Sequence, residues 1–224
     1  YADEIIVLSE NVKKYFMDTY GRETIFIPNG VDRPIKRSPR LIKEKFGLDK
    51  DEYILFLGRL VPEKGLTYLI EAFKNTDTEK KLVIAGGSSD TDTFTQELKK
   101  MAEDDNRIIF TGFVQGEILE ELYSNAYIYT LPSNLEGMPL SLLEAMSYGN
   151  CCLTSDIAEC IEVVEDKALT FRKSDVSDLC NKLQYACDCV DEVNRLKANA
   201  ANFICCKYNW DNVVEQTLKL YEQR

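Results

Sequence analysis

Histidine is absent from this sequence of 224 residues. The chain therefore lacks the side chain that most often serves as a general acid or base near neutral pH and that commonly binds zinc. No C-x-x-C pair occurs, and the eight cysteines all lie between Cys151 and Cys206, several of them among apolar neighbours. We interpret them as reduced, structural thiols of a cytosolic protein and expect no metal site.

Other common signals are missing as well. No run of about 18 apolar residues is present, so no transmembrane segment is predicted. The first residues, YADEIIVLSE, have neither an initial methionine nor the basic segment of a signal peptide, which indicates a piece of a longer chain. The net charge of −11 argues against a nucleic acid as partner and against a polybasic membrane anchor, because both require a basic surface.

Short apolar runs alternate with amphipathic stretches along the chain. The predicted strands are 5–8, 24–27, 53–57, 81–85, 107–110, 127–130, 151–154 and 168–171. The predicted helices are 10–19, 66–75, 93–103, 117–124, 139–148, 176–189, 192–207 and 212–222. Central strands that are apolar on both sides are typical of a parallel sheet covered by helices on both faces. The sequence predicts an α/β fold with a doubly wound, mostly parallel, Rossmann-like sheet.

Ligands of such sheets bind beyond the carboxyl ends of the strands. Three predicted strands end in loops that contain glycine, namely GRLVPEKG at 58–65, GGSSD at 86–90 and TGFVQGE at 111–117. No G-x-G-x-x-G follows a strand, so the usual dinucleotide fingerprint is missing. PNGVDRP at 28–34 is a turn-rich break, and we expect the chain before it to lie outside the central sheet.

The loop GRLVPEKG carries two cations, Arg59 and Lys64. Gly58 and Gly65 would allow the backbone to turn tightly and to approach a ligand. The helix that follows directs its positive N-terminal end toward the same region. These features predict a local anion site in an otherwise acidic chain, and the alternative is a pair of solvated loop charges.

The stretch EGMPLSLLEAMS carries two carboxylates, Glu136 before an apolar helix and Glu144 inside it. We expect Glu144, inside the helix, to be poorly solvated and to need a partner. If Pro139 opens the helix, the backbone amides of Leu140 and Ser141 are free to hold a phosphate oxygen. Glu136 and Glu144 could then both accept hydroxyl groups of one extended ligand. The alternatives are a helix-dipole partner for Glu136 and a core salt bridge for Glu144.

In order and spacing, these motifs resemble the C-terminal, donor-binding domain of family 4 (group 1) glycosyltransferases, which have the GT-B fold. GRLVPEKG is similar to the G-R-x(4)-K-G loop of that family, and EGMPLSLLEAMSYGN to its E-x(7)-E element. The resemblance implies an inter-domain crossover segment at 1–34 and a nucleotide-sugar-binding domain at 35–207. It also implies a C-terminal helix at 208–224 that packs toward an N-terminal acceptor domain absent from this sequence.

The resemblance also implies roles for individual residues. Arg59 and Lys64 would act in catalysis by contacting the diphosphate, and Glu136 by orienting the sugar. Glu144 would bind the ribose hydroxyls. The nucleobase would lie against the loop that contains Phe113 and Val114. The whole donor-binding set would be Gly58, Arg59, Lys64, Phe113, Val114, Glu136, Gly137, Met138, Pro139, Leu140, Ser141 and Glu144.

The implied activity is that of a retaining hexosyltransferase, with UDP or GDP as the nucleotide of the donor sugar and with no metal or cofactor. The implied acceptor is a surface glycan or a lipid-linked precursor, so we expect a cytoplasmic enzyme that works at the inner face of the membrane. The chain alone would bind a donor without transferring sugar. The sequence leaves open a non-catalytic nucleotide-binding module and another GT-B enzyme, such as a sugar-nucleotide epimerase. A dinucleotide-dependent oxidoreductase is disfavoured by the missing glycine fingerprint.

Overall fold

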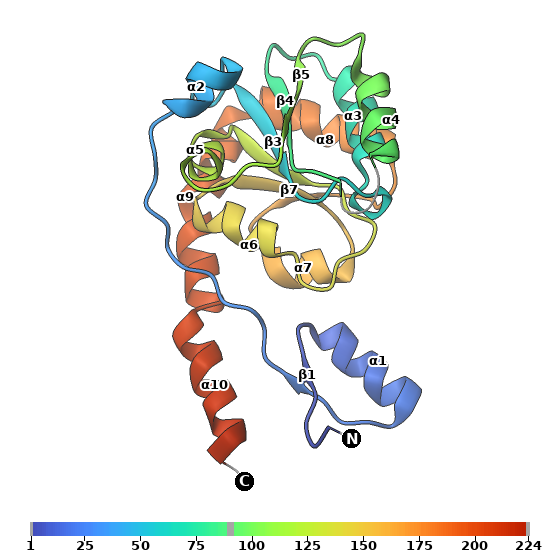
Figure 1. Ribbon diagram of the computed structural model, residues 1–224, viewed down its shortest axis with the longest axis vertical. Coiled ribbons are helices and arrows are strands. Elements are labelled where there is room, and N and C mark those ends of the chain that lie inside the picture. Colours follow the sequence, from blue (N-terminus) through green and yellow to red (C-terminus); the bar gives the residue numbers. More distant parts are fainter. Residues whose placement is uncertain (1, 89–91, 223–224) are drawn as a thin grey trace.

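The centre of the molecule is a parallel sheet of six strands in the order β5-β4-β3-β6-β7-β8 (Figure 1). The structure is a computed structural model and describes residues 2–88 and 92–222. The strands are β3 Tyr53–Leu57, β4 Lys81–Ala85, β5 Ile108–Gly112, β6 Ile128–Leu131, β7 Cys151–Ser155 and β8 Leu169–Phe171. The chain enters the central sheet at β3, in the middle, and adds β4 and β5 on one side. It then returns to form β6 on the other side of β3, followed by β7 and β8. This is the doubly wound topology that the sequence predicts.

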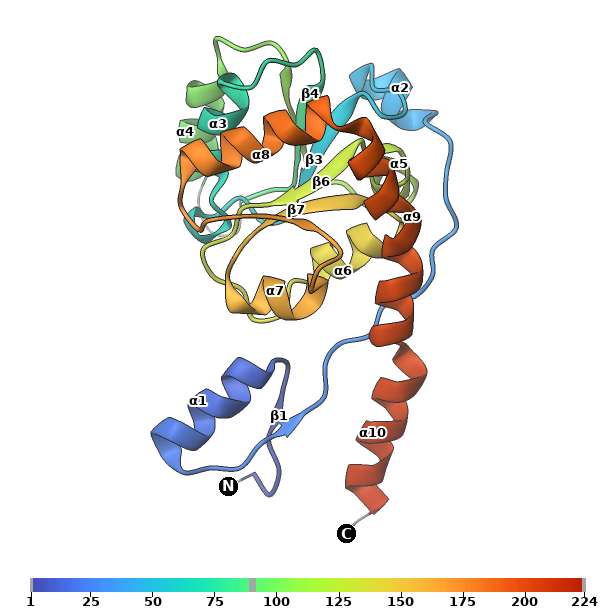
Figure 2. The ribbon, with the colours of Figure 1, turned by 180° about the vertical axis from the view of Figure 1, so that it is seen from behind.

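Helices cover both faces of the sheet, which explains why its strands are apolar without alternation. All four residues of β6 and all five of β7 are buried. Helix α3 packs against α8, which crosses the face of the sheet seen in Figure 2, and α6 packs against α9. The helices around the sheet are α2 Leu41–Phe46, α3 Leu66–Lys74, α4 Thr93–Ala102, α5 Glu117–Asn125, α6 Leu140–Ser147, α7 Ala158–Val164, α8 Val176–Asp188 and α9 Val190–Lys207.

Two short helices, α2 and α7, are not predicted from the sequence. With 6 and 7 residues they are too short for a 3.6-residue period to become visible. The predicted helix at 139–148 exists, but α6 begins one residue later than expected, at Leu140. Pro139 precedes the helix with a ψ of 80°, outside the helical region.

The chain before the break at 28–34 lies outside the central sheet, as predicted. β1 Ile6–Val7 and β2 Ile25–Phe26 form a separate two-stranded parallel sheet that is connected through α1 Glu10–Tyr20 (Figure 1). At the other end of the chain, α10 Trp210–Glu222 extends away from the main sheet beyond α9.

Helix α10 has no buried residue. Trp210 is 42% exposed and Tyr221 is 72% exposed. The last helix therefore presents an exposed apolar face. Among the helices within residues 2–88 and 92–222, none combines the length and the apolar character that a membrane span requires.

The eight cysteines are all free thiols. Cys151, Cys152 and Cys160 are buried in the core, where they pack as small apolar side chains. Burial raises the pKa of the Cys160 thiol to about 12, so that it stays protonated at neutral pH. The interpretation of these three cysteines as structural residues is confirmed.

Candidate functional site

The sheet changes its winding direction between β3 and β6, and we call the edge of the sheet beyond the carboxyl ends of these two strands the switch point. Ligands of open α/β sheets bind at such a point. The two strands are parallel neighbours, so the loops after their carboxyl ends start at the same edge of the sheet. These loops are 58–65 after β3 and 132–139 after β6. Both carry residues that the sequence assigns to ligand binding.

Two glycines allow the loops at this edge to touch backbone to backbone. Gly65 has a φ of +67°, and a Cβ atom there would lie 2.1 Å from the Pro132 carbonyl oxygen. Gly86, after β4, has a φ of +144°, and its Cβ would lie 1.8 Å from the Gly58 carbonyl oxygen. Only glycine fits either position. The predicted glycine-dependent turn is thus confirmed at Gly65, whereas Gly58 itself has no positive φ. Residues 89 and 90 of the GGSSD loop lie outside the described residues.

Lys64 and Glu136 form an ion pair across the switch point. Lys64 Nζ lies 2.5 Å from Glu136 Oε1, and the side chains are only 14% and 7% exposed. The Ser133 hydroxyl donates a second hydrogen bond to the same oxygen, at 2.6 Å. The sequence predicts a separate task for each residue and gives no sign of their contact. A lysine ammonium has three donors, and the bond to Glu136 occupies one of them. Lys64 can therefore bind Glu136 and an anion together.

Arg59 lies in the same loop as Lys64, and its side chain is exposed. Among the described residues, no side chain pairs with its guanidinium. Arg59 lines a pocket of about 400 Å³ together with Gly58, Phe113 and Val114, beyond the ends of β3, β4 and β5. Phe113 is 75% exposed at the rim. The structure thus brings four of the predicted donor-binding residues to one pocket.

The N-terminus of α6 differs from the prediction of two free amides. The Leu140 amide donates to the Met138 carbonyl oxygen at 2.9 Å, because the backbone at Pro139 folds into a tight turn. The prediction of a free amide is therefore wrong for Leu140. Within the part of the chain that the structure describes, the Ser141 amide has no hydrogen-bond partner. The structure leaves one of the two expected amides available.

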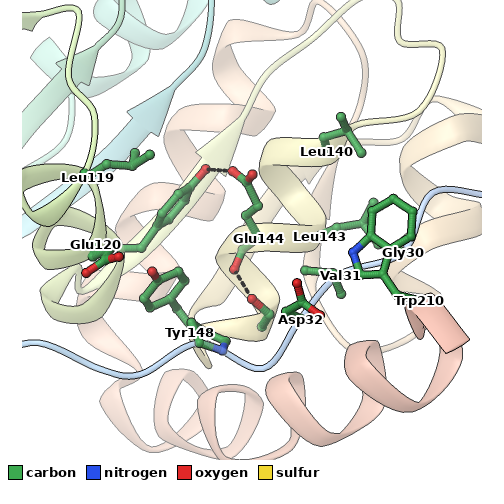
Figure 3. Close-up of a pocket in the computed structure, with 14 residues that line it drawn as sticks. Gly30, Val31, Asp32, Leu119, Glu120, Leu140, Leu143, Glu144, Tyr148 and Trp210 are labelled. Carbon is green, nitrogen blue, oxygen red and sulfur yellow. Dashed lines mark hydrogen bonds between the residues drawn. The ribbon is translucent and has the colours of Figure 1, made fainter.

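The expectation that Glu144 is poorly solvated is wrong. Helix α6 buries most of its surface, but Glu144 is exposed and lines a pocket of about 380 Å³ between α5 and α6 (Figure 3). Its Oε2 accepts a hydrogen bond from the Tyr123 hydroxyl at 2.9 Å. Glu144 thus bonds to a hydroxyl group, whereas the alternative considered from the sequence was a salt bridge within the core. Tyr123 was missed because a tyrosine in an amphipathic helix has no sequence signal beyond that of a core residue.

The remaining walls of this pocket come from distant parts of the chain. Residues 30–32, Pro34 and the first residue of α10, Trp210, close its side (Figure 3). Gly30 lies so close to Trp210 that a Cβ atom would be 2.5 Å from the indole. Tyr148 stacks on Tyr123 with ring centroids 5.2 Å apart. From the sequence, residues 28–34 are predicted to be a turn-rich break within the crossover segment, and not part of a site.

The family of glycosyl transferases group 1 matches residues 39–203. The match covers more than half of the chain and includes both loops at the switch point. The chain belongs to this family. The assignment to group 1 is thus confirmed, and the doubly wound parallel sheet agrees with the GT-B fold expected from the sequence.

Individual relatives agree with the family. O-antigen chain mannosyltransferase B of Escherichia coli is 28% identical over 84% of this chain and 51% of its own length. The E. coli UDP-Gal:alpha-D-GlcNAc-diphosphoundecaprenol alpha-1,3-galactosyltransferase is 30% identical over 87% of this chain and 53% of its own. The chain therefore spans about half the length of the curated relatives it matches.

The same fold occurs in HepE of Anabaena, whose crystal structure in complex with UDP and glucose superposes with a TM-score of 0.91. The superposition covers 100% of this chain and 64% of the HepE chain, at 19% sequence identity. Sucrose-phosphate synthase from Thermosynechococcus elongatus superposes with a TM-score of 0.84 over 100% of this chain and 58% of its own, at 24% identity. These likenesses show a common fold.

Proposed function

We propose that this chain binds the nucleotide-diphospho-sugar donor of a hexosyltransferase and stabilises the diphosphate that leaves during transfer. The observation that carries the proposal is the ion pair of Lys64 with Glu136 at the switch point. Arg59, in the same loop as Lys64, adds a second cation, whose guanidinium pairs with no side chain among the described residues. In a chain with a net charge of −11, cations at this edge favour an anionic ligand. The galactosyltransferase relative is named for a UDP-sugar, and a HepE crystal structure contains UDP-glucose, which supports this class of donor.

Transfer breaks the bond between C1 of the sugar and an oxygen of the diphosphate, so negative charge grows on the leaving group. Fixed donors aimed at the developing charge usually make the largest contribution to such a reaction. We assign this role to Lys64, to Arg59 and to the Ser141 amide at the start of α6, which has no partner within the described residues. The low exposure of Lys64 strengthens its effect, because a charge acts more strongly where water is excluded.

Glu136 would hold the transferred sugar. Both hydrogen bonds found on its carboxylate use Oε1, which leaves Oε2 to accept a sugar hydroxyl. The backbone from Gly137 through Pro139 would complete the sugar site, and Glu144 would bind the ribose. Phe113 and Val114 would lie against the nucleobase. In this assignment Glu136 orients the sugar and is not a general base.

Binding of the donor class is tested by calorimetry with UDP, GDP, ADP and NAD on this chain. We expect one ribonucleoside diphosphate to bind and NAD to bind weakly or not at all. Arg59→Ala should weaken that binding about tenfold, since a charged hydrogen bond contributes roughly 1.5–3 kcal/mol. Arg195→Ala, which removes an exposed arginine that pairs with Glu192 on α9, is the control and should bind normally. Binding of NAD alone would contradict the proposal.

We further propose that transfer retains the anomeric configuration and needs no divalent metal. Two fixed cations can take over the charge stabilisation that a metal ion would otherwise provide. One acidic triplet, Asp90-Thr91-Asp92, follows β4, and its first two residues lie outside the described ranges. Asp92 accepts a hydrogen bond from the Ser88 hydroxyl at 2.7 Å.

Removal of divalent metal is expected to leave the rate of the full-length enzyme unchanged within about twofold. The reason is that Lys64 and Arg59 supply the positive charge themselves. Initial rates are compared in excess EDTA and in excess Mg²⁺, and the anomeric form of the product is read by NMR. A rate that vanishes in EDTA and returns with Mg²⁺ would instead point to a metal bound by carboxylates such as those of 90–92.

The acceptor, in this proposal, is a glycan or lipid-linked precursor held by a second domain beyond residues 1–34 and 208–224. The exposed apolar face of α10 supports such a neighbour. The names of the two E. coli relatives, one an O-antigen chain enzyme and one acting on a diphosphoundecaprenol substrate, support the acceptor class. We propose that the enzyme works in the cytoplasm at the inner membrane face, where lipid-linked acceptors of this kind would be available.

A further inference from the structure

Tyr123 on α5 makes the side-chain hydrogen bond that Glu144 receives within the described chain. The Tyr123 hydroxyl lies 2.9 Å from Glu144 Oε2, and this bond is the dashed line at the Glu144 carboxylate in Figure 3. The same hydroxyl lies 3.3 Å from the Ser141 carbonyl oxygen. Glu144 is otherwise exposed to the pocket between α5 and α6. The direction of its carboxylate therefore depends on a hydroxyl group from a neighbouring helix.

The Tyr123 side chain is itself held firmly. It is 1% exposed, and its ring stacks on Tyr148 at 5.2 Å and is tilted against Tyr129 at 6.0 Å. The Asn150 side-chain amide donates to the Tyr123 backbone carbonyl at 2.8 Å. Burial raises the pKa of Tyr123 well above its usual value of 10, so the hydroxyl keeps its proton and remains a donor at neutral pH. A fixed donor thus meets a carboxylate that would otherwise rotate freely in water.

One hydrogen bond leaves most of the carboxylate available. An ionised carboxylate accepts about four hydrogen bonds, and Tyr123 occupies one of them, on Oε2. A vicinal diol needs two acceptor positions in a defined direction. A carboxylate that is already fixed binds the diol without losing further rotational freedom, which favours binding.

We propose that Tyr123 is a positioning residue, which fixes the Glu144 carboxylate for the ribose diol and thereby sets the preference of this site for ribonucleotides over 2′-deoxyribonucleotides. This inference rests on the proposed function, because it requires a nucleotide in the pocket. It adds to that function a determinant of ligand specificity that does not need to touch the ligand. The 2′-deoxy ligand offers only one of the two hydroxyls, so it gains less from a fixed carboxylate.

The test compares the nucleoside diphosphate that binds best, among UDP, GDP and ADP, with its 2′-deoxy form. Calorimetry gives both dissociation constants for the wild-type chain and for Tyr123→Phe, with thermal unfolding as a check on folding. We expect the wild type to prefer the ribonucleotide about tenfold, the effect of one charged hydrogen bond. In Tyr123→Phe the preference should fall to about twofold, mainly through weaker binding of the ribonucleotide.

Two further variants separate positioning from packing. Tyr127→Phe removes another buried hydroxyl, one that bonds the Ala186 carbonyl at 2.6 Å, and should keep the wild-type preference. Glu144→Gln should lose the preference, and adding Tyr123→Phe to it should change the ratio no further, as expected for two residues that act as one unit.

The outcomes distinguish this inference from the function on which it rests. A wild-type chain that binds none of the three nucleoside diphosphates would overturn the proposed function and this inference with it. A wild-type chain that binds one of them, with a Tyr123→Phe variant that keeps the full ribonucleotide preference, would overturn the inference alone. Equal weakening of both ligands by Tyr123→Phe would show a purely structural role and would overturn it too.

Discussion

Replacing Lys64 by alanine in the full-length enzyme is expected to lower turnover about 10²–10³-fold while changing the donor KM little. This is the usual cost of removing one fixed donor from a developing negative charge. The effect falls on turnover because the charge of the leaving group grows only as the bond to the sugar breaks. Steady-state kinetics with saturating donor measures it.

The same substitution should also destabilise the chain. Glu136 is 7% exposed on its side chain, so the loss of Lys64 would leave a nearly buried carboxylate without its cation. Breaking a buried pair in this way costs about 3–5 kcal/mol. The double variant Lys64→Ala/Glu136→Gln removes the unpaired charge and should recover most of the stability, with no recovery of turnover.

Lys74→Ala is the matched control for both measurements. Lys74 Nζ pairs with Asp104 Oδ1 at the same distance of 2.5 Å, but Asp104 is 68% exposed, and the pair lies at the other end of α3. An exposed pair contributes at most about 1 kcal/mol, and neither turnover nor stability should change much. A Lys64→Ala enzyme with near-normal turnover at saturating donor would contradict the role of Lys64 at the leaving group.

The sheet could be predicted from the sequence because its signal is local. Strands such as Tyr53–Leu57 and Lys81–Ala85 are short, continuous apolar runs, and the structure places both within the predicted bounds. The amphipathic helices between them were found for the same reason. α2 and α7 were not, because one and a half to two helical turns give too few positions for a period to appear.

The functional site was predictable only as a set of loops. Topology alone places the loops 58–65 and 132–139 side by side at the switch point, and sequence motifs identify their charged residues. The ion pair between Lys64 and Glu136 joins residues 72 positions apart, and no local pattern encodes such a contact. For Glu144 the sequence led to a wrong prediction of burial. Its apolar helix suggested burial, but solvation depends on how α5 and α6 leave a groove between them, which is a property of packing.

Substituting Gly65 by alanine is expected to destabilise the chain by about 4 kcal/mol or more and to abolish donor binding. A non-glycine residue at a φ of +67° costs about 1–2 kcal/mol by itself. The added Cβ would also lie 2.1 Å from the Pro132 carbonyl oxygen, which belongs to the backbone of the neighbouring loop. Either loop must move to relieve this contact, and the movement separates Lys64 from Glu136.

Gly47→Ala isolates the contribution of the contact. Gly47 has nearly the same φ, +61°, and follows the last residue of α2, but no atom beyond its chain neighbours lies within 4 Å of the position of its Cβ. This variant should lose only the conformational cost of about 1–2 kcal/mol and should bind the donor normally. Urea unfolding and calorimetry of both variants measure the difference. If the two unfold within about 1 kcal/mol of each other, the contact with Pro132 does not hold the two loops together, and the close packing of the switch point does not depend on glycine.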